Sequence, residues 1–200
     1  MQNYAVDDTN YIDDPFVEEM IDGKIYLMAR PDSRHLIIQR NLSEIFRDYF
    51  KKNKRKCTAI SEMQIYIDEY NYVEPDVLIY CIDNNKKKDR RIPVIIIEVL
   101  SPSTWKKDVT SKMQKYAEIG IEEYWTIDYL AKRINIYKLN GDKYDFHESY
   151  YFFSEEDFSI VPKIRAKEEG EFIKEFSPIS FPEMTILLED VFNLEDLELI

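Results

Sequence analysis

The chain has 200 residues, of which 44% are hydrophobic and 33% charged, and it contains fifteen Tyr and eleven Phe. This length and composition suit one packed domain and exclude a disordered chain, because apolar residues are abundant and both charge signs are mixed. No apolar run approaches the roughly 18 residues of a membrane-spanning helix, and the net charge of −12 argues against nucleic acid as a partner of the surface taken as a whole.

The charge is unevenly distributed along the chain. Residues 30–120 hold 18 Lys and Arg against 13 Asp and Glu, whereas the remaining residues hold 9 against 26. The middle of the chain is therefore basic within an acidic protein. Any affinity for DNA would come from this middle part and would fall steeply with salt concentration.

The N-terminus and the cysteines predict a cytoplasmic protein. The first residues contain neither the basic nor the apolar segment of a secretory signal. Cys57 and Cys81 lie in different segments, and two reduced thiols are the simplest interpretation. The two histidines, His35 and His147, are far apart in sequence and do not match a Cys/His zinc site.

The N-terminal part predicts a hairpin followed by a long helix. Residues 1–14 are acidic and expected to be loose, and residues 16–28 predict a structural hairpin because Asp22-Gly23 is a strong turn signal. Pro31-Asp32-Ser33 marks the start of a helix, which should end with the basic residues 51–56. Apolar residues fall on one face of this helix at helical spacing: Ile38, Leu42, Ile45, Phe46 and Tyr49.

The middle part predicts three strands and a second helix. Residues 61–68 alternate like a half-buried strand that Asn71 ends, and residues 76–80 form the next strand after Pro75. Residues 94–100 are apolar on both faces except at Glu98, which is typical of a central strand covered on both sides. Residues 108–119 predict a helix with Gly120 at its C-cap. Its expected inward residues are Val109, Met113, Tyr116 and Ala117.

The C-terminal part predicts three more strands and a short helix. The strands should cover residues 124–128, 133–139 and 143–153, and the helix should lie near residues 184–192. No internal repeat or long linker separates a second domain, so residues 1–200 are expected to form one domain. In it, residues 154–200 would be a C-terminal extension packed on the core.

Two carboxylates lie in apolar runs where a lone charge is costly. Glu98 follows four apolar residues, and Asp76 directly precedes three more. A buried carboxylate costs several kcal/mol unless it is paired or binds a metal. Two adjacent strands could bring Asp76 and Glu98 to one edge of a sheet, and such oxygen ligands suit Mg²⁺ or Mn²⁺. Lys112, one turn into the following helix, could then reach the strand ends and stabilise charge on a phosphate. The alternative is that both acids face water and Lys112 is an exposed helix residue.

Other candidates have structural alternatives of their own. His35 lies one turn before Ile38 and could look toward the site, although a lone histidine on an apolar face is more often a packing residue. Gln114 points outward and could touch a phosphate. The loop after residue 82 could also contact DNA phosphates, although a charge run is most often a plain solvated turn. Its basic residues are Lys86, Lys87, Lys88, Arg90 and Arg91.

Several motifs together resemble the Uma-type putative restriction endonuclease family of the PD-(D/E)XK nuclease superfamily. They are E-P-D-V-L-I-Y, V-I-I-I-E-V-L-S-P-S-T, K-K-D-V-T-S-K-M-Q-K-Y and G-I-E-E-Y-W-T-I-D. Similarity extends to D-G-K-I in the hairpin, to the P-x-S-x-x-H helix start, to I-N-I-Y-K-L and to the short C-terminal helix. The resemblance thus covers most of residues 16–192.

The resemblance implies a fold and a set of site residues. The fold would be α/β and restriction-endonuclease-like, with a mixed β-sheet core flanked by helices and an N-terminal β-hairpin. The two acids of the superfamily match Asp76 and Glu98, and the backbone carbonyl of Val99 would be a further metal ligand. The lysine of the superfamily motif falls at Leu100, and in this family Lys112 takes its role.

The sequence therefore predicts a Mg²⁺- or Mn²⁺-dependent DNA endonuclease, with DNA as its partner, no membrane partner and a homodimer as an open alternative. The proposed catalytic residues are Asp76, Glu98 and Lys112, with His35 as a further candidate. One rival is a catalytically latent nuclease fold that binds nucleic acid or regulates a partner. A second rival is an interaction protein whose acidic surface docks a basic partner.

Overall fold

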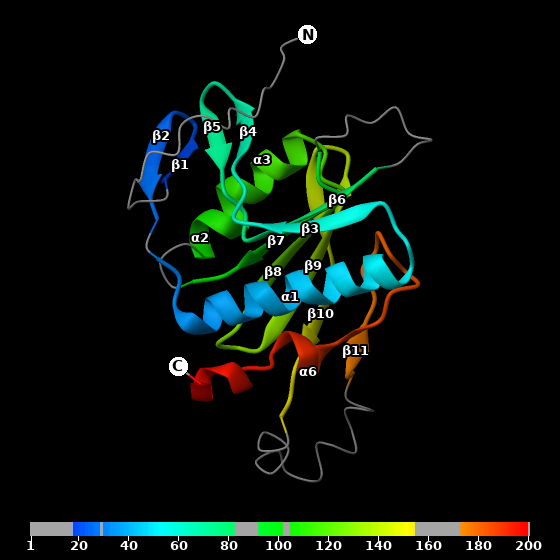
Figure 1. Cartoon of the computed structure of the whole chain (residues 1–200). Coiled ribbons are helices and arrows are strands. Elements are labelled where there is room, and N and C mark those ends of the chain that lie inside the picture. Colours follow the sequence, from blue (N-terminus) through cyan, green and yellow to red (C-terminus); the bar gives the residue numbers. More distant parts are fainter. Residues whose placement is uncertain (1–17, 29, 83–91, 102–104, 155–172, 200) are drawn as a thin grey trace, which may run out of the picture.

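The computed structural model describes residues 18–28, 30–82, 92–101, 105–154 and 173–199, which form three sheets and the helices around them (Figure 1). The strands are β1 (Glu18–Ile21), β2 (Lys24–Leu27), β3 (Cys57–Ser61), β4 (Ile65–Asp68), β5 (Asn71–Val73), β6 (Val77–Cys81), β7 (Ile95–Val99), β8 (Glu123–Asp128), β9 (Arg133–Asn140), β10 (Lys143–Tyr151), β11 (Glu175–Phe176) and β12 (Ile186–Leu187). The helical segments are α1 (Ser33–Lys52), α2 (Trp105–Lys107), η1 (Asp108–Lys112), α3 (Met113–Glu118), α6 (Leu188–Val191) and η2 (Glu195–Leu199).

The main sheet has six strands in the order β10-β9-β8-β7-β6-β3. Strands β7 and β8 are parallel and joined by the α2–η1–α3 segment, while the other neighbours are antiparallel. A parallel pair needs such a crossover, which puts helix on one face of the sheet. All five residues of β7 are buried, as predicted for a central strand. The predicted α/β fold with a mixed sheet and flanking helices is confirmed.

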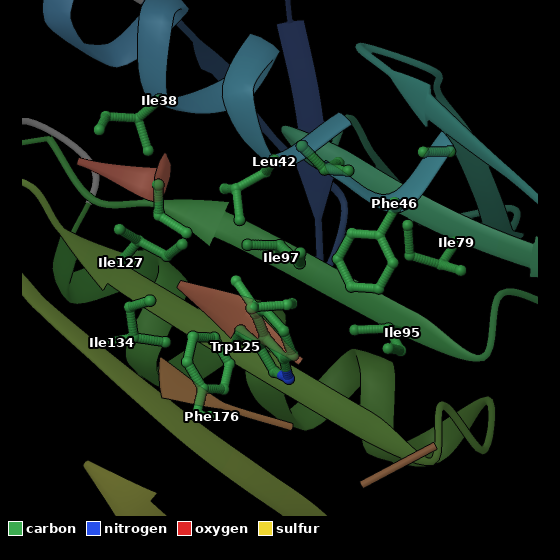
Figure 2. Close-up of a cluster of buried hydrophobic side chains, with 14 of the residues drawn as sticks. Ile38, Leu42, Phe46, Ile79, Ile95, Ile97, Trp125, Ile127, Ile134 and Phe176 are labelled. Carbon is green, nitrogen blue, oxygen red and sulfur yellow. The ribbon is translucent and has the colours of Figure 1, made fainter. Parts of the chain in front are cut away.

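Helix α1 covers one face of this sheet with the apolar stripe predicted from its spacing. It begins where Asp32 caps it, because the Asp32 carboxylate accepts the His35 N–H at 2.9 Å. Figure 2 shows its apolar side chains over those of β6, β7 and β8. The labelled residues of this core are Ile38, Leu42, Phe46, Ile79, Ile95, Ile97, Trp125, Ile127, Ile134 and Phe176. This core therefore fixes α1 across the central strands.

The opposite face is covered by the α2–η1–α3 segment, which packs through aromatic rings. Tyr116 of α3 lies 5.5 Å, ring to ring, from Tyr124 of β8, and both are fully buried. Ile96 of β7 and Ile121 belong to the same cluster. The central strand is thus enclosed between α1 on one face and the crossover helix on the other.

The predicted N-terminal hairpin is confirmed, and it is part of a four-stranded sheet in the order β2-β1-β5-β4. Asp22 and Gly23 form its turn with positive φ angles of 51° and 74°. Of the predicted strand at residues 61–68, only Ile65–Asp68 forms a strand of its own, β4. Ser61 is the last residue of β3, and Glu62 after it has a left-handed φ of 52°. Asn71 was predicted to end the preceding strand. In the structure it is instead the first residue of β5.

The C-terminal segment packs on the side of the sheet that carries α1. Trp125 contacts Phe176 of β11 with ring centroids 5.3 Å apart, and α6 packs beside α1 (Figure 1). The carboxylate of Glu123 is fully buried and accepts hydrogen bonds from Trp125 and from the backbone of Ile179 and Ser180. A buried acid is thus used here as a structural anchor.

Cys57 and Cys81 form a disulfide between β3 and β6, so the prediction of two reduced thiols is wrong for this structure. The two residues face each other directly in the antiparallel register, with their Cα atoms 4.0 Å apart. This proximity depends on strand pairing across 24 residues of sequence, which residue spacing does not reveal.

None of the helices in the described ranges is long and apolar enough to cross a membrane.

Candidate active site

The two predicted acids meet where β6 begins and β7 ends. Val77 of β6 pairs with Ile97 of β7, and continuing this antiparallel register by one residue places Asp76 opposite Glu98. The Val99 N–H donates a hydrogen bond of 2.6 Å to Asp76 Oδ2. The carboxylate of Asp76 therefore lies against the Glu98–Val99 peptide. The register of the central sheet, rather than a local turn, brings the two acids together.

His35 reaches Asp76 from the first turn of α1. Its Nε2 lies 2.8 Å from Asp76 Oδ1, and Gln39, one turn later, donates from Nε2 to the Asp76 carbonyl at 2.9 Å. The side chains of His35 and Asp76 are 10% and 19% exposed. Burial would lower the pKa of His35, but the hydrogen bond and charge of Asp76 outweigh it and raise that pKa. Helix α1 thus fixes the orientation of Asp76.

Glu98 is held from the other face of the sheet by the crossover helix. Its Oε1 accepts a hydrogen bond of 2.6 Å from the Tyr116 hydroxyl and forms an ion pair of 2.6 Å with Lys112 Nζ. Burial raises the pKa of Glu98 well above its usual range, Lys112 opposes this, and the nearby acids Asp108 and Asp76 raise it further. The environment of Glu98 therefore carries an excess of negative charge.

Lys112 is a buried ammonium surrounded by three carboxylates. Its side chain is 1% exposed, and its Nζ lies 2.6 Å from Glu98, 2.9 Å from Glu19 and 3.4 Å from Asp108. Burial would lower the pKa of Lys112, but the three acids outweigh burial and raise it well above its usual value. Lys112 is therefore a fixed positive charge at neutral pH, and its Nζ lies within 3.4 Å of three carboxylates.

Glu19 of β1 joins the N-terminal sheet to this cluster. Its carboxylate is fully buried and binds Lys112 through Oε1 and Lys107 through Oε2. The side chain of Lys107 is only 12% exposed, because it pairs with Glu19. Burial acts to raise the pKa of Glu19, and the two lysines outweigh it and lower that pKa.

A π-helical turn sets which residues of the crossover helix face the sheet. The segment η1 covers Asp108–Lys112 and inserts one extra residue into the helical turn. The Tyr124 hydroxyl donates to the backbone carbonyl of Asp108 at 3.0 Å. As a result Asp108, Lys112 and Tyr116 are buried at intervals of four residues. Val109 and Met113, which regular helical spacing predicted to be inward, are only partly buried.

The donor set around Asp76 and Glu98 fits a hard divalent cation. Two carboxylates with the adjacent Val99 carbonyl are oxygen ligands of the kind Mg²⁺ binds while retaining several waters. The local excess of acid is also visible at Glu74, where burial, Glu62 and Glu19 raise the pKa to about 7. Among the residues the structure describes, no group of three or more His, Cys, Asp or Glu side chains could hold a metal ion. A cation here would thus have two carboxylate ligands and would share Glu98 with Lys112.

Of the predicted phosphate-contacting residues, only Gln114 lies in the described part of the chain, and it is not part of this cluster. Lys86, Lys87, Lys88, Arg90 and Arg91 lie outside the described residues. The last described residue before them, Ile82, donates from its N–H to the Lys56 carbonyl at 2.8 Å. This contact is at the end of β6 away from Asp76. Gln114 is exposed and bonds to Glu118 on its own helix at 3.0 Å.

Three residues that contact the site were missed by sequence reasoning: Glu19, Asp108 and Tyr116. Glu19 and Ile21 alternate onto the same buried face of β1, so a charge on the apolar face of the predicted hairpin was an available signal. Tyr116 was predicted to be a core residue, and it is buried, but its hydroxyl also bonds to Glu98. Asp108 was not singled out, because regular helical spacing placed Val109, and not Asp108, on the inward face.

Comparisons with known proteins support a nuclease fold. The uncharacterized protein slr1290 of Synechocystis sp. is 30% identical over 128 residues, which cover 62% of this chain and 67% of that protein. The crystal structure of a chain described as "a putative nuclease belonging to DUF820" from Anabaena variabilis has the same fold. It has a TM-score of 0.61 at 20% identity over 88% of this chain and 89% of that chain. The family model described as "Putative restriction endonuclease" (Uma2) matches residues 12–164, which are more than half of the sequence. The chain therefore belongs to the Uma2 family of putative restriction endonucleases.

Proposed function

We propose that this protein is a DNA endonuclease that depends on Mg²⁺ or Mn²⁺ and hydrolyses phosphodiester bonds with a metal-activated water. The observation that carries the proposal is the meeting of Asp76 and Glu98 at the end of β7, with Lys112 Nζ 2.6 Å from Glu98. Membership of the Uma2 family supports the nuclease class. Metal dependence and a DNA substrate are the parts of the proposal that require experiment.

Asp76, Glu98 and the carbonyl of Val99 would hold the cation. When bound there, a divalent cation supplies an activated water and neutralises charge on the phosphate oxygens. Asp76 is partly exposed, with 19% of its side chain accessible, whereas Glu98 is buried. Substrate would therefore approach the site from the side of Asp76.

The protein groups around the acids have distinct tasks in this proposal. Lys112 retains its proton, because three carboxylates raise its pKa, and it therefore acts as a fixed charge and not as a general base. Such a preorganised charge stabilises the negative charge that develops on phosphorus. His35 orients Asp76 through the 2.8 Å contact of Nε2 with Oδ1. Tyr116 orients Glu98 through its hydroxyl.

DNA binding is proposed for the basic middle part of the chain. The loop residues Lys86, Lys87, Lys88, Arg90 and Arg91 would contact backbone phosphates, with Gln114 as a further contact. We also propose that the protein acts in the cytoplasm. A homodimer would present two such sites to the two strands of a duplex, and the molar mass in solution tests it.

One observation favours a second candidate function, a latent nuclease that binds nucleic acid without cutting it. Lys112 is 1% exposed, and its Nζ lies within 3.4 Å of carboxylate oxygens of Glu98, Glu19 and Asp108, so the ammonium is not open to a substrate. An active site would require at least one of these contacts to be released. DNA binding without cleavage in the presence of Mg²⁺ and Mn²⁺ would favour the latent form.

Cleavage of supercoiled plasmid by the purified protein tests the proposal. We expect nicked and linear products with Mg²⁺ or Mn²⁺, no products with EDTA, and a loss of at least about 10²-fold in rate for Asp76→Asn and Glu98→Gln. Glu44→Gln removes the same charge from an exposed position of α1 and should cleave like the wild type. Cleavage that persists in Asp76→Asn would contradict the proposed site. Binding to a basic protein, unaffected by both acid variants, would instead favour an interaction protein.

A further inference from the structure

Glu19 has contacts that a structural hairpin residue does not need. It lies on β1, in the small sheet, yet its side chain is 0% exposed and points into the cluster around Glu98. Its Oε1 accepts from Lys112 at 2.9 Å and from the Glu74 N–H at 3.1 Å, and its Oε2 binds Lys107. Burying a carboxylate is costly, and these three donors compensate the burial of Glu19.

The contacts of Glu19 reach both halves of the candidate active site. Lys112 and Lys107 belong to the crossover helix that follows β7. Glu74 precedes Asp76 by two residues in the connection from β5 to β6. One carboxylate therefore ties the N-terminal sheet to the segment that leads to Asp76 and to the lysine that contacts Glu98. Removing it would loosen both sides together.

The contacts of Lys112 indicate why its ammonium needs a carboxylate partner besides Glu98. Glu98, at 2.6 Å, is its shortest contact, but Glu98 is also the proposed ligand of a cation. A carboxylate shared with a cation attracts an ammonium less strongly, because the two positive charges repel each other. Asp108, at 3.4 Å, is a longer contact on the same helix as Lys112. Glu19, at 2.9 Å, is the contact that can hold Lys112 from a different element of the fold.

We propose that Glu19 is a positioning residue of the active site, which holds the Lys112 ammonium beside Glu98. This inference rests on the proposed nuclease function and assigns a role in it to the N-terminal sheet. Glu19 does not touch the substrate, because it is fully buried behind Lys112. Its effect on the reaction is exerted through Lys112. Lys107 shares Glu19 and balances its charge on the side away from Lys112.

The experiment combines amine labelling with a double-mutant cycle. Acetic anhydride labelling with mass spectrometry reports how accessible Lys112 is, and needs neither metal nor DNA. In Glu19→Gln we expect Lys112 to be labelled about tenfold faster than in the wild type, because its opening becomes easier. We expect plasmid cleavage with Mn²⁺ to be slowed about tenfold, within the range seen for directly coupled residues. Glu18→Gln, one residue away on β1, is the matched control and should change neither result.

The cycle separates positioning from a merely structural role. If Glu19 acts through Lys112, then adding Glu19→Gln to Lys112→Met slows cleavage no further. An equal slowing by Glu19→Gln with and without Lys112 would overturn the inference. Unchanged labelling of Lys112 in a folded Glu19→Gln protein would overturn it as well. If Glu19→Gln does not fold, Glu19→Asp replaces it, and the shorter side chain should still speed labelling and slow cleavage.

The two proposals fail in different ways. If the wild type does not cleave with any metal, the nuclease function fails, while faster labelling of Lys112 in Glu19→Gln would still support its positioning by Glu19. If the wild type cleaves and Glu19→Gln cleaves at the same rate, the positioning role fails, while the nuclease function stands.

Discussion

Lys112 shows how a single buried charge depends on its neighbours. An isolated ammonium would lose its proton on burial, yet the acids Glu98, Asp108 and Glu19 raise the pKa of Lys112 well above its usual value. The same acids need Lys112, because without it three carboxylates would share a dry site. Each charge in this cluster is thus tolerated only because the others are present.

Replacing Lys112 with Met should separate catalysis from metal binding. We expect the cleavage rate with Mn²⁺ to fall by about 10²-fold, the scale for losing one preorganised electrostatic group. The metal-free protein should melt at a lower temperature, because breaking a buried ion pair costs about 3–5 kcal/mol. The rise in melting temperature on adding Mn²⁺ should be larger than in the wild type, since a competing positive charge has gone.

Lys106 provides the matched control for this variant. It lies on the same helical segment and is exposed, whereas Lys107 is unsuitable because it pairs with Glu19. Lys106→Met should cleave like the wild type and melt at the same temperature. A Lys112→Met protein that cleaves at the wild-type rate would show that the buried ammonium has no part in the reaction.

Residues of the candidate site could be predicted where the signal was local. Asp76 and Glu98 stood out because each is a lone charge in an apolar run, and the structure brings both to the end of β7. Glu19 was overlooked although it lies on the buried face of β1, and Asp108 was not singled out because regular helical spacing placed Val109 inward instead. Lys112 was predicted to reach the strand ends; in the structure it contacts Glu98 from within the core.

At the scale of single elements, the periodicity of apolar residues predicted the regular helix α1, but it did not predict the π turn in the crossover helix. The apolar stripe of α1 and its cap at Asp32 follow from spacing and residue type alone. The crossover helix departs from the prediction because its π turn rotates Asp108 and Lys112 inward. A π turn has no reliable sequence signal, and such turns are frequent at functional sites. The element that was hardest to predict is thus the one that carries Lys112.

Removing the cap of α1 should weaken the helix that orients His35. Asp32 accepts hydrogen bonds from the His35 N–H and from the Tyr129 hydroxyl, both at 2.9 Å. Asp32→Ala removes the cap and leaves Tyr129 without this partner, which should cost about 1–2 kcal/mol of unfolding free energy. Asp48→Ala, at an exposed position later in α1, should cost much less. Urea unfolding at pH 7 measures the difference.

The stabilisation that the Asp32 cap gives to α1 should decrease at acidic pH. The hydrogen bond from the His35 backbone is the main reason that the pKa of Asp32 is lowered from 3.8. A lowered folded-state pKa means that the stabilisation is present above about pH 4 and is lost as the pH falls through the folded-state value. The stability difference between wild type and Asp32→Ala should therefore shrink below pH 4. A constant difference down to pH 3 would contradict this account of the cap.

At the scale of the whole molecule, the fold class and family were predictable, but long-range pairing was not. The resemblance to the nuclease family implied an α/β fold with a mixed sheet, and the helical crossover between β7 and β8 accounts for the parallel pair. The placement of β1 beside β5, and of Cys57 opposite Cys81, required the register of separate segments. These contacts could not be predicted, because the sequence near one partner does not indicate which distant residue it pairs with.

The Cys57–Cys81 disulfide should stabilise the oxidised protein. Closing a loop of 24 residues restricts the unfolded chain and is worth about 3 kcal/mol in the chain-entropy treatment. We expect the oxidised form to unfold at a higher urea concentration than the form reduced with dithiothreitol. The double variant Cys57→Ser/Cys81→Ser should not respond to the reductant. The same unfolding midpoint in both redox states of the wild type would show that the bond does not stabilise the fold.

The basic loop should govern DNA affinity more than other lysines do. Replacing Lys86, Lys87 and Lys88 with Gln should weaken DNA binding and flatten the dependence of log affinity on log salt by up to about three units. The matched control replaces Lys51, Lys52 and Lys54, which are exposed near the end of α1, with the same residue. If both triple variants lose affinity equally, the effect is one of net charge and the loop has no special role.

The central claim is that Asp76 and Glu98 share a divalent cation at the end of β7. The most direct measurement is an anomalous difference map from a crystal of the protein soaked in Mn²⁺. We predict one or two peaks within ligand distance of both carboxylates and of the Val99 carbonyl, and none at this place in crystals of Asp76→Asn. A soaked crystal with an ordered site and no anomalous peak between Asp76 and Glu98, or with its peak at other residues, would contradict the account.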